Sequence, residues 1–409
     1  MQIFNLKNNI KVLFEKTGGA KVFSLKIFSP ISATSEDISK AGVCALTNNL
    51  MQKATMSRSK ERLAKDIDDI GASLSSLQDY DFSCLSIDCL SEFFVSAAEI
   101  LSDIIINPSF SADELAFEKE MLKAFFKSNQ DDIKSVVGEH FAKNFYNGSS
   151  YQYHYCGSPD TTDNINLDDI KAMHKFSYNA SNILISIAGN IDFESVKNVL
   201  ERNFGSIKEG QKFKEPQFAV KSPSKEKEII DGKFNQAFIL TGFPVSSLRD
   251  KNFAAISVLS NILGGRMTSR LFIELREKLG LAYEVGSSYN AKLVKSHFSI
   301  YIGLDKKNID LTLKRIDEIL KNFCAKGVGK EELNNVKTYI KGIYALSRLT
   351  TSAKSRFYGL KELLWGDYAY DESYLNEVES VNEQTIREIA NEIFKQKSFT
   401  IILKPKKEI

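Results

Sequence analysis

Short stretches of alternating apolar and polar residues mark the first part of the chain. Residues 10–14 and 22–28 alternate with a period of two, and residues 72–81 and 82–90 do so again. Successive side chains of a strand point to opposite faces of a sheet, so this pattern predicts four strands. The last two follow one another closely and are expected to form a hairpin.

Apolar residues spaced three and four apart predict helices at 41–53, 59–70, 92–107 and 111–130. A glycine follows the second of these and a proline the third, as expected where helices end. The fourth opens on Ser-Ala-Asp-Glu, which is typical of a helix N-terminus.

A polar stretch at 209–228 contains two prolines and no sustained periodicity, which predicts a linker. Strand and helix patterns then recur in a similar order: strand 236–243, helices 252–263 and 269–279, hairpin 282–304, helices 308–326 and 330–346, and strand 399–404. The shared order indicates duplication of one α+β unit.

Composition excludes several classes of protein. A length of 409 residues with 43% hydrophobic and 26% charged residues favours a globular protein of two domains. A net charge of +2 gives no general attraction to nucleic acid or to an anionic membrane. Five scattered cysteines without a Cys-x-x-Cys predict neither disulfides nor a zinc cluster.

No apolar run in the sequence approaches the roughly 20 residues needed to cross a bilayer. We therefore expect a cytoplasmic protein, or a periplasmic one if a leader has been removed.

The helix predicted at 41–53 has the frame of a metal-binding helix without the ligands. The segment from Lys40 to Thr55 resembles the zinc-binding helix of the pitrilysin, insulinase and mitochondrial-processing-peptidase family, which carries His-x-x-Glu-His. The correspondence rests on the framework residues Gly42, Leu46, Leu50, Lys53 and Thr55. It places the first His of the family at Ala45, its Glu at Asn48 and its second His at Asn49.

The third zinc ligand of the family is a Glu on the helix that corresponds to 111–130, and its position here is Phe125. Another Glu of the family, seven residues earlier, corresponds to Glu118. A methyl group, two neutral amides and a phenyl ring supply neither good zinc ligands nor a general base. The resemblance thus implies a chain without zinc or any other cofactor. A plain reading of 41–53 is an ordinary amphipathic helix.

In the same family, substrate adds as an extra strand to a sheet edge that carries Asn-Ala-x-Thr. Ser75-Ser-Leu-Gln78 stands in that place here. The alternating pattern of this edge strand remains, but its residues differ from those with which the family binds substrate.

Residues 263–283 resemble the second-domain signature of the family, Gly-Gly-x-x-Ser-Ser-Arg-Leu-Phe-x-x-Leu-Arg-Glu-x-x-Gly-Leu-Ala-Tyr. The resemblance implies that Arg276 and Tyr283 bind substrate near a zinc ion. A guanidinium suits a peptide carbonyl or carboxylate, and a phenol can donate to an oxyanion. Gly280 is expected to end the helix between them. In the structural alternative, Arg276 pairs with a nearby Glu and Tyr283 packs in the core.

The resemblance covers nearly the whole chain. It implies two sequential domains, 1–208 and 229–409, each a mostly antiparallel sheet with helices on one face, which together form half of a clamshell. It further implies the non-catalytic, substrate-binding subunit of a heterodimeric zinc metallopeptidase, inactive alone, whose zinc lies only in a homologous partner subunit.

Three alternatives remain. One is a structural scaffold, like the core subunits of respiratory cytochrome bc complexes, and another is an enclosed peptide carrier. The third is a self-sufficient homodimeric peptidase, which is disfavoured because no two of the four histidines have metal-binding spacing.

Overall fold

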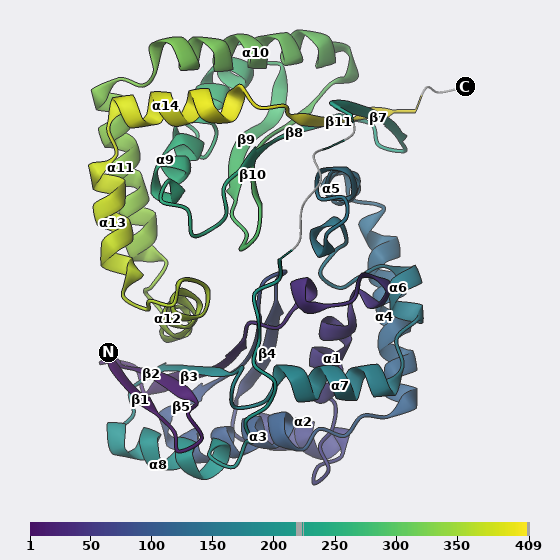
Figure 1. The fold of residues 1–409 in the computed structure, drawn as a ribbon, viewed down its shortest axis with the longest axis vertical. Helices are drawn as coiled ribbons and strands as arrows, with labels where there is room; N and C mark the ends of the chain where they lie inside the picture. Colours follow the sequence, from purple (N-terminus) through teal and green to yellow (C-terminus); the bar gives the residue numbers. More distant parts are fainter. Residues whose placement is uncertain (218–222, 224, 407–409) are drawn as a thin grey trace. The chain divides into compact units, whose positions relative to one another are not determined.

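The computed structural model describes residues 1–217, 223 and 225–406 (Figure 1). The chain forms two compact units, and each contains one sheet. Unit 1 comprises Met1–Phe126, Tyr153–Pro216 and Ala345–Tyr370, and unit 2 comprises Lys127–Gln152, Gln217–Tyr344 and Asp371–Ile409. The predicted linker at 209–228 lies partly outside the described residues, and its last two residues belong to a strand.

In the described part of unit 1, six strands form a sheet in the order β1-β2-β6-β3-β5-β4. Their bounds are β1 (Gln2–Asn5), β2 (Lys11–Lys16), β3 (Val22–Ser29), β4 (Ser73–Gln78), β5 (Ser83–Leu90) and β6 (Leu184–Gly189). Strands β2 and β6 are parallel, and the other neighbours are antiparallel.

The sheet of unit 2 repeats this arrangement in the order β7-β11-β8-β10-β9. Its described strands are β7 (Lys227–Gly232), β8 (Ala237–Val245), β9 (Ala282–Asn290), β10 (Ser296–Leu304) and β11 (Phe399–Pro405). Strands β7 and β11 are parallel, like β2 and β6, and the rest are antiparallel. The α+β class is therefore confirmed, and the matching strand orders support the predicted duplication.

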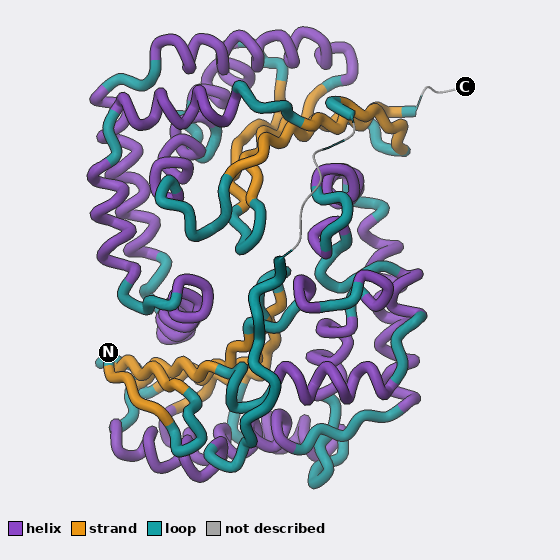
Figure 2. The backbone as a smooth tube through the Cα atoms, viewed as in Figure 1, coloured by secondary structure: helices purple, strands orange, loops and turns teal. Residues whose placement is uncertain are grey.

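Helices surround both sheets (Figure 2). Unit 1 contains α1 (Val43–Met51), α2 (Lys60–Asp69), α3 (Phe94–Ile106), nearly all of α4 (Ala112–Asn129), α6 (Pro159–Asp163), α7 (Leu167–Ser177), α8 (Phe193–Phe204) and α12 (Thr351–Trp365). Unit 2 contains α5 (Ile133–Phe145), α9 (Phe253–Leu263), a π-helix (Phe272–Lys278), α10 (Ile309–Lys326), α14 (Glu383–Phe394) and nearly all of both α11 (Lys330–Leu346) and α13 (Tyr370–Ser380). The four helices predicted between residues 41 and 130 correspond to α1–α4.

Two helices pack on the sheet of the other half of the chain. Helix α5 lies against β8 and β11, and α12 lies against β2, β3 and β6. Each compact unit therefore includes one segment from the other predicted domain: residues 127–152 of the predicted domain 1–208 belong to unit 2, and residues 345–370 of the predicted domain 229–409 belong to unit 1.

This exchange covers both faces of each sheet, whereas the sequence predicted helices on one face. In β3, Leu25 and Ile27 belong to the hydrophobic core that includes α3 and α8. Ser24 and Lys26 alternate with them and bind residues of α12. In β8, Gly242 lies against Phe141 of α5 while its neighbour Phe243 packs on α14.

The seat of α12 on unit 1 is polar except at Phe28, whose ring lies against Gly359. Ser186 Oγ donates to the Ser355 carbonyl at 2.7 Å, and Ser355 Oγ donates to Ser24 Oγ at 2.9 Å. Lys26 is buried, and its Nζ donates to Ser352 Oγ at 3.1 Å. These pairings satisfy polar groups that would otherwise be costly to bury.

The seat of α5 on unit 2 is aromatic. Phe141 stacks on Phe145 with ring centroids 4.8 Å apart and packs on Phe399 at 5.8 Å. Tyr146 is buried, and its hydroxyl lies 2.5 Å from Nδ1 of His297, whose pKa burial lowers to about 3. His297 is thus neutral, while Lys292 lies over the Tyr146 ring and Lys134 of α5 pairs with Glu284 of β9.

Close packing of α12 can be tested at Gly359, where an added Cβ would lie 2.2 Å from Cε2 of the buried Phe28 ring. We expect Gly359→Ala to lower the free energy of unfolding by about 1–3 kcal/mol, the usual cost of overpacking. Gly342→Ala is the matched control, since Gly342 lies in α11 with nothing within 4 Å of an added Cβ. It should gain up to about 1 kcal/mol from helix propensity. Urea unfolding measures both, and equal effects would contradict the assigned packing.

Candidate functional site

The face of α1 that corresponds to the zinc-binding face of the family is filled by uncharged side chains. Ala45 is buried and presents a methyl group. Asn48 is buried, and both ends of its amide are used: Nδ2 donates to Gln78 Oε1 at 3.1 Å and Oδ1 accepts from the Tyr178 hydroxyl at 2.7 Å. This amide cannot act as a general base and is held away from other partners.

Asn49 and Lys53 both bind the carboxylate of Glu118 on α4. Asn49 Nδ2 donates to Oε2 at 3.0 Å, and Lys53 Nζ lies 2.7 Å from Oε1. Glu118 is only 5% exposed, so its charge is balanced inside the protein. Glu118, which the sequence aligned with a Glu of the family, thus takes part in an ion pair that joins α4 to the end of α1.

Phe125 is 39% exposed. Its centroid lies 5.4 Å from that of His154 and 5.5 Å from that of Phe126. Burial lowers the pKa of His154 to about 4, so this ring is uncharged at neutral pH. Aromatic rings thus lie at the position where the sequence resemblance predicts a carboxylate ligand.

The residues at these positions do not fit a zinc ion, because their donor set consists of a methyl group, two bonded amides and a phenyl ring. Across the part of the chain that the structure describes, no group of three His, Cys, Asp or Glu side chains is placed to hold a metal.

Glu36 holds the N-terminus of α1 and was missed by the sequence analysis. Its carboxylate accepts from the backbone N–H of Gly42 at 2.8 Å and of Cys44 at 2.7 Å. Gly42 has φ of +101°, and an added Cβ would lie 2.3 Å from the carbonyl oxygen of Cys156. The framework glycine is therefore required both by its conformation and by its close contact.

Arg276 lies on the π-helix, where the sequence predicted a helix without specifying its type. Its side chain is exposed, with the guanidinium 4.9 Å from the ring centroid of Phe272. Gly280, with φ of +58°, follows the helix, and the N–H groups of Gly280 and Leu281 donate to the carbonyls of Arg276 and Leu275. The predicted helix end at Gly280 is confirmed. Helices of the π type are rare in proteins, and those that occur often lie at functional sites.

Tyr283 stands near the start of β9, an edge strand of the sheet of unit 2, and is 42% exposed. Its ring lies over Gly303 of β10, where a Cβ would be 2.4 Å from the phenol oxygen. Partial burial and the Glu284 carboxylate raise the pKa of Tyr283 against the opposing effect of Lys134, so the phenol keeps its proton at neutral pH.

The structural alternative for these two residues finds no support. Tyr283 is not in the core, and no ion pair of Arg276 occurs among the described residues. The π-helix packs against β9, but no hydrogen bond joins Arg276 to Tyr283 within the described ranges.

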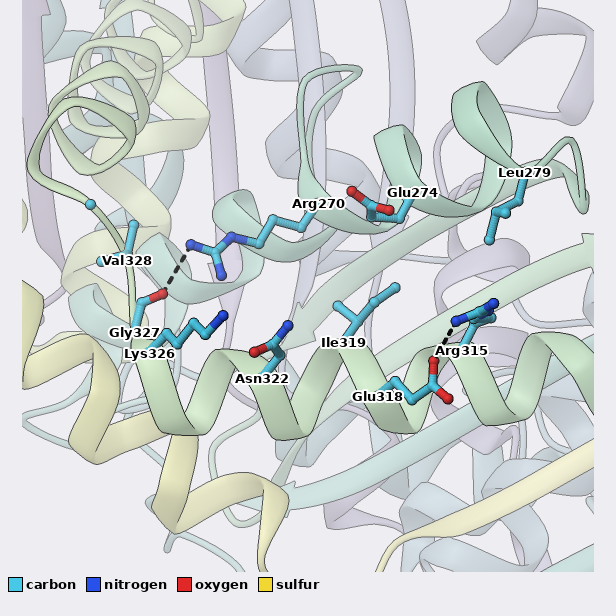
Figure 3. Close-up of a pocket in the computed structure, with 11 residues that line it drawn as sticks. Arg270, Glu274, Leu279, Arg315, Glu318, Ile319, Asn322, Lys326, Gly327 and Val328 are labelled. Atoms are coloured by element: carbon cyan, nitrogen blue, oxygen red, sulfur yellow. Dashed lines mark hydrogen bonds and ion pairs between the residues drawn. The ribbon is translucent and has the colours of Figure 1, made fainter.

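A hollow of about 770 Å³ lies between α10 and the segment that carries Arg270 and Glu274 (Figure 3). Neither Arg276 nor Tyr283 lines it. Arg270 binds Glu332 in a bidentate pair and donates to the Gly327 carbonyl at 2.9 Å. Because the guanidinium of Arg270 is already bound within the protein, we place the candidate site at Arg276 and Tyr283 rather than in this hollow.

Two family models match successive parts of the chain. The model of insulinase (peptidase family M16) matches residues 11–158, and the model of the peptidase M16 inactive domain matches residues 164–340. The chain belongs to the M16 family.

An uncharacterized zinc protease of Bacillus subtilis is 26% identical over 406 residues, which is 98% of each chain. A crystal structure of a peptidase M16 inactive domain from Pseudomonas fluorescens has a TM-score of 0.91 and 20% identity, covering 99% of this chain and 98% of that one. A chain of the complex III2 structure from Candida albicans has a TM-score of 0.82 and 17% identity, covering 98% and 95%. The M16 fold thus extends over nearly the whole chain, while no described helix has the length and apolar character of a membrane span.

The buried Glu36 predicts an unusual dependence of stability on pH. Burial raises its pKa from 4.5 to about 7, so the folded chain retains a proton that the unfolded chain releases above pH 4.5. Its stabilising contribution is full below that pH and is lost as pH rises to 7. Between pH 5 and 8 we expect the wild type to lose about 2–3 kcal/mol relative to Glu36→Gln.

The measurement is urea unfolding of the wild type and of the variant at several pH values. Glu61→Gln is the control, because Glu61 is exposed at the first turn of α2 and its pKa is lowered from 4.5, so its contribution changes only at and below that pH and the difference from the wild type should stay nearly constant from pH 5 to 8. A difference between wild type and Glu36→Gln that stays constant from pH 5 to 8 would show that Glu36 is not protonated in the fold.

Proposed function

We propose that this M16 chain is the non-catalytic, substrate-binding subunit of a heterodimeric zinc metallopeptidase. A homologous partner subunit supplies the zinc, and this chain supplies Arg276 and Tyr283 to the peptide being cut. The observation that carries the proposal is the contrast between a zinc face filled by bonded amides and a second motif whose arginine and tyrosine are exposed.

The chemistry of the two residues suits this role. The Arg276 guanidinium offers a fixed fork of donors to a peptide carbonyl or carboxylate. A protonated Tyr283 can donate to the oxyanion that forms when water attacks a peptide bond. Glycine at 303 leaves room for the phenol over β10.

The scaffold alternative is motivated by the likeness to a chain of complex III2. A scaffold has no need of an exposed Arg and Tyr in the family motif, so substrate binding is the better supported function. An enclosed peptide carrier would keep these residues without a catalytic partner.

The purified chain should contain far less than one zinc per molecule and hydrolyse no peptide. The physical reason is the donor set at residues 45, 48, 49 and 125. Elemental analysis after dialysis, together with a fluorogenic peptide assay, measures both properties. Retention of about one zinc per chain, with activity lost on chelation, would contradict the proposal.

In the reconstituted complex, Tyr283→Phe should lower kcat by about 10²-fold, as removal of one oxyanion donor does. Arg276→Ala should also raise KM, since an arginine can hold the ground state of the substrate. Tyr339→Phe is a matched control, because Tyr339 is a similarly exposed tyrosine of unit 2 outside the motif. Steady-state cleavage by the complex and by the partner alone is measured. Full activity of both motif variants, or of the unaided partner, would favour the scaffold.

A further inference from the structure

Tyr283 lies at a β-bulge, a point where strand β9 has one residue more than its neighbour β10. Gly303 of β10 lies opposite Glu284, and the next residue, Leu304, lies opposite Ala282. Tyr283 therefore has no residue of β10 opposite it. Bulges redirect side chains out of the regular alternation of a strand and are common next to active sites. The direction of the Tyr283 side chain is thus a property of the bulge.

The bulge brings the side chains of Tyr283 and Glu284 to one face of the sheet. Residues opposite one another on neighbouring strands point to the same face, so the space over Gly303 lies on the face of Glu284. The Tyr283 ring fills this space, with Cζ 2.4 Å from where a Cβ of residue 303 would stand. Ala282 and Val285, on either side, are buried. In a strand without the bulge, successive side chains would alternate, and one of the two would turn toward the core.

Glu284 is held on this face by Lys134 of α5. Lys134 Nζ lies 2.5 Å from Glu284 Oε1, across a separation of 150 residues in the sequence. Helix α5 packs against β8 and β11, so this lysine extends from an element that is already fixed on the sheet. Lys134 stands in the first turn of α5, close behind the N-cap Asp132. The helix dipole disfavours a cation there, and the Glu284 carboxylate offsets that cost.

Both charges of the pair act on the Tyr283 phenol. Partial burial and the Glu284 carboxylate raise the pKa of Tyr283, and Lys134 lowers it. The Glu284 contact raises the pKa of Lys134 in turn, against the effect of burial, with further contributions from Tyr301 and Asp132. Loss of either partner would therefore leave an unbalanced charge beside the phenol.

The two sides of the bulge are fixed by different contacts. Before it, Leu281 is buried, and its N–H donates to the Leu275 carbonyl at 2.8 Å. After it, pairing with β10 resumes at Glu284, the residue that binds Lys134. A strand that loses a contact of this kind can open locally or change its register by one residue. The ion pair thus holds the first paired residue after Tyr283.

We propose that Lys134 and Glu284 are positioning residues for Tyr283: their ion pair fixes the strand directly after the bulge, so that the phenol stays over Gly303 and is presented to the peptide. The inference rests on the proposed function and adds to it two residues that act through the phenol. The motif of Arg276 and Tyr283 is then completed by a lysine that lies far outside it in the sequence.

The first test measures hydrogen exchange of the full chain alone by mass spectrometry. Lys134→Met and Glu284→Gln each remove one charge of the pair. Each should make the amides of residues 281–286 exchange about 2- to 5-fold faster, the range that an exposed ion pair supplies. The charge-exchanged variant, Lys134→Glu with Glu284→Lys, should restore the wild-type rate, and thermal unfolding verifies the fold of each variant.

Asp317→Asn is the matched control for these variants. It removes the acid of another exposed ion pair of unit 2, in which Asp317 Oδ2 lies 2.6 Å from Lys321 Nζ on α10. This substitution should leave exchange at residues 281–286 unchanged, because the pair does not contact β9.

The second test uses the reconstituted complex with its zinc-bearing partner. Lys134→Met and Glu284→Gln should lower kcat about 2- to 5-fold and leave KM near the wild-type value, since Arg276 is unchanged. In a Tyr283→Phe background, Glu284→Gln should cause no further loss, because the hydroxyl that the pair positions is absent. A merely structural role of the pair would give the same loss in both backgrounds.

Unchanged exchange at the bulge in both single variants, no restoration by the exchanged charges, or equal losses of kcat with and without the Tyr283 hydroxyl would overturn the inference. The proposed function is judged separately, by Tyr283→Phe alone in the complex. Full activity of that variant would reject the proposed function, whereas faster exchange in the single variants, with restoration by the exchanged pair, would still support Lys134 and Glu284 as the residues that position Tyr283.

Discussion

Strand β3 is buried on both faces, and its own half of the chain covers only one of them. Every residue from Phe23 to Ser29 is buried. The apolar face lies on the core of α3 and α8, and the other face requires α12, which arrives from more than 300 residues later in the sequence. The same need in the second sheet is met by α5. Covering both faces of each sheet is thus the constraint that fixes how the two halves divide the chain between them.

The two exchanged helices meet this constraint by different chemistry. Helix α12 rests on serines and a buried lysine, which bond its backbone and hydroxyl groups. Helix α5 rests on stacked phenylalanines and a neutral histidine. A polar seat specifies position through hydrogen bonds, and an apolar seat contributes mainly burial of area.

Most of the strands and many of the helices could be predicted from periodicity and punctuation. Helices α5, α8, α12, α13 and α14 were not predicted, and two of them, α5 and α12, take their partners from distant sequence. Because α5 and α12 were missed, the predicted domains 1–208 and 229–409 do not include the exchange of these helices between the two compact units. A helix that packs on a strand some 330 positions away carries no local signal of its partner, so no reading of neighbouring residues could assign it.

The candidate site was predicted in part for a similar reason. The family motif identifies Arg276 and Tyr283, and Gly280 marks the end of the helix that carries Arg276, because these signals are local in the sequence. The π-helical winding, the exposure of Phe125 and the cap at Glu36 depend on contacts between segments. A carboxylate six residues before a framework glycine gives no sign that it will accept two backbone N–H groups.

The serines beneath α12 have a consequence for synthesis of the protein. Chains leave the ribosome from the N-terminus, and domains generally begin to fold as they emerge. The first sheet can therefore assemble on α3 and α8 while its second face still waits for residues 351–365. An entirely apolar waiting face would invite aggregation, whereas Ser24, Lys26 and Ser186 can be hydrated beside Phe28 until the helix is made. The polar seat therefore also protects the nascent chain during the interval before its last cover is synthesised.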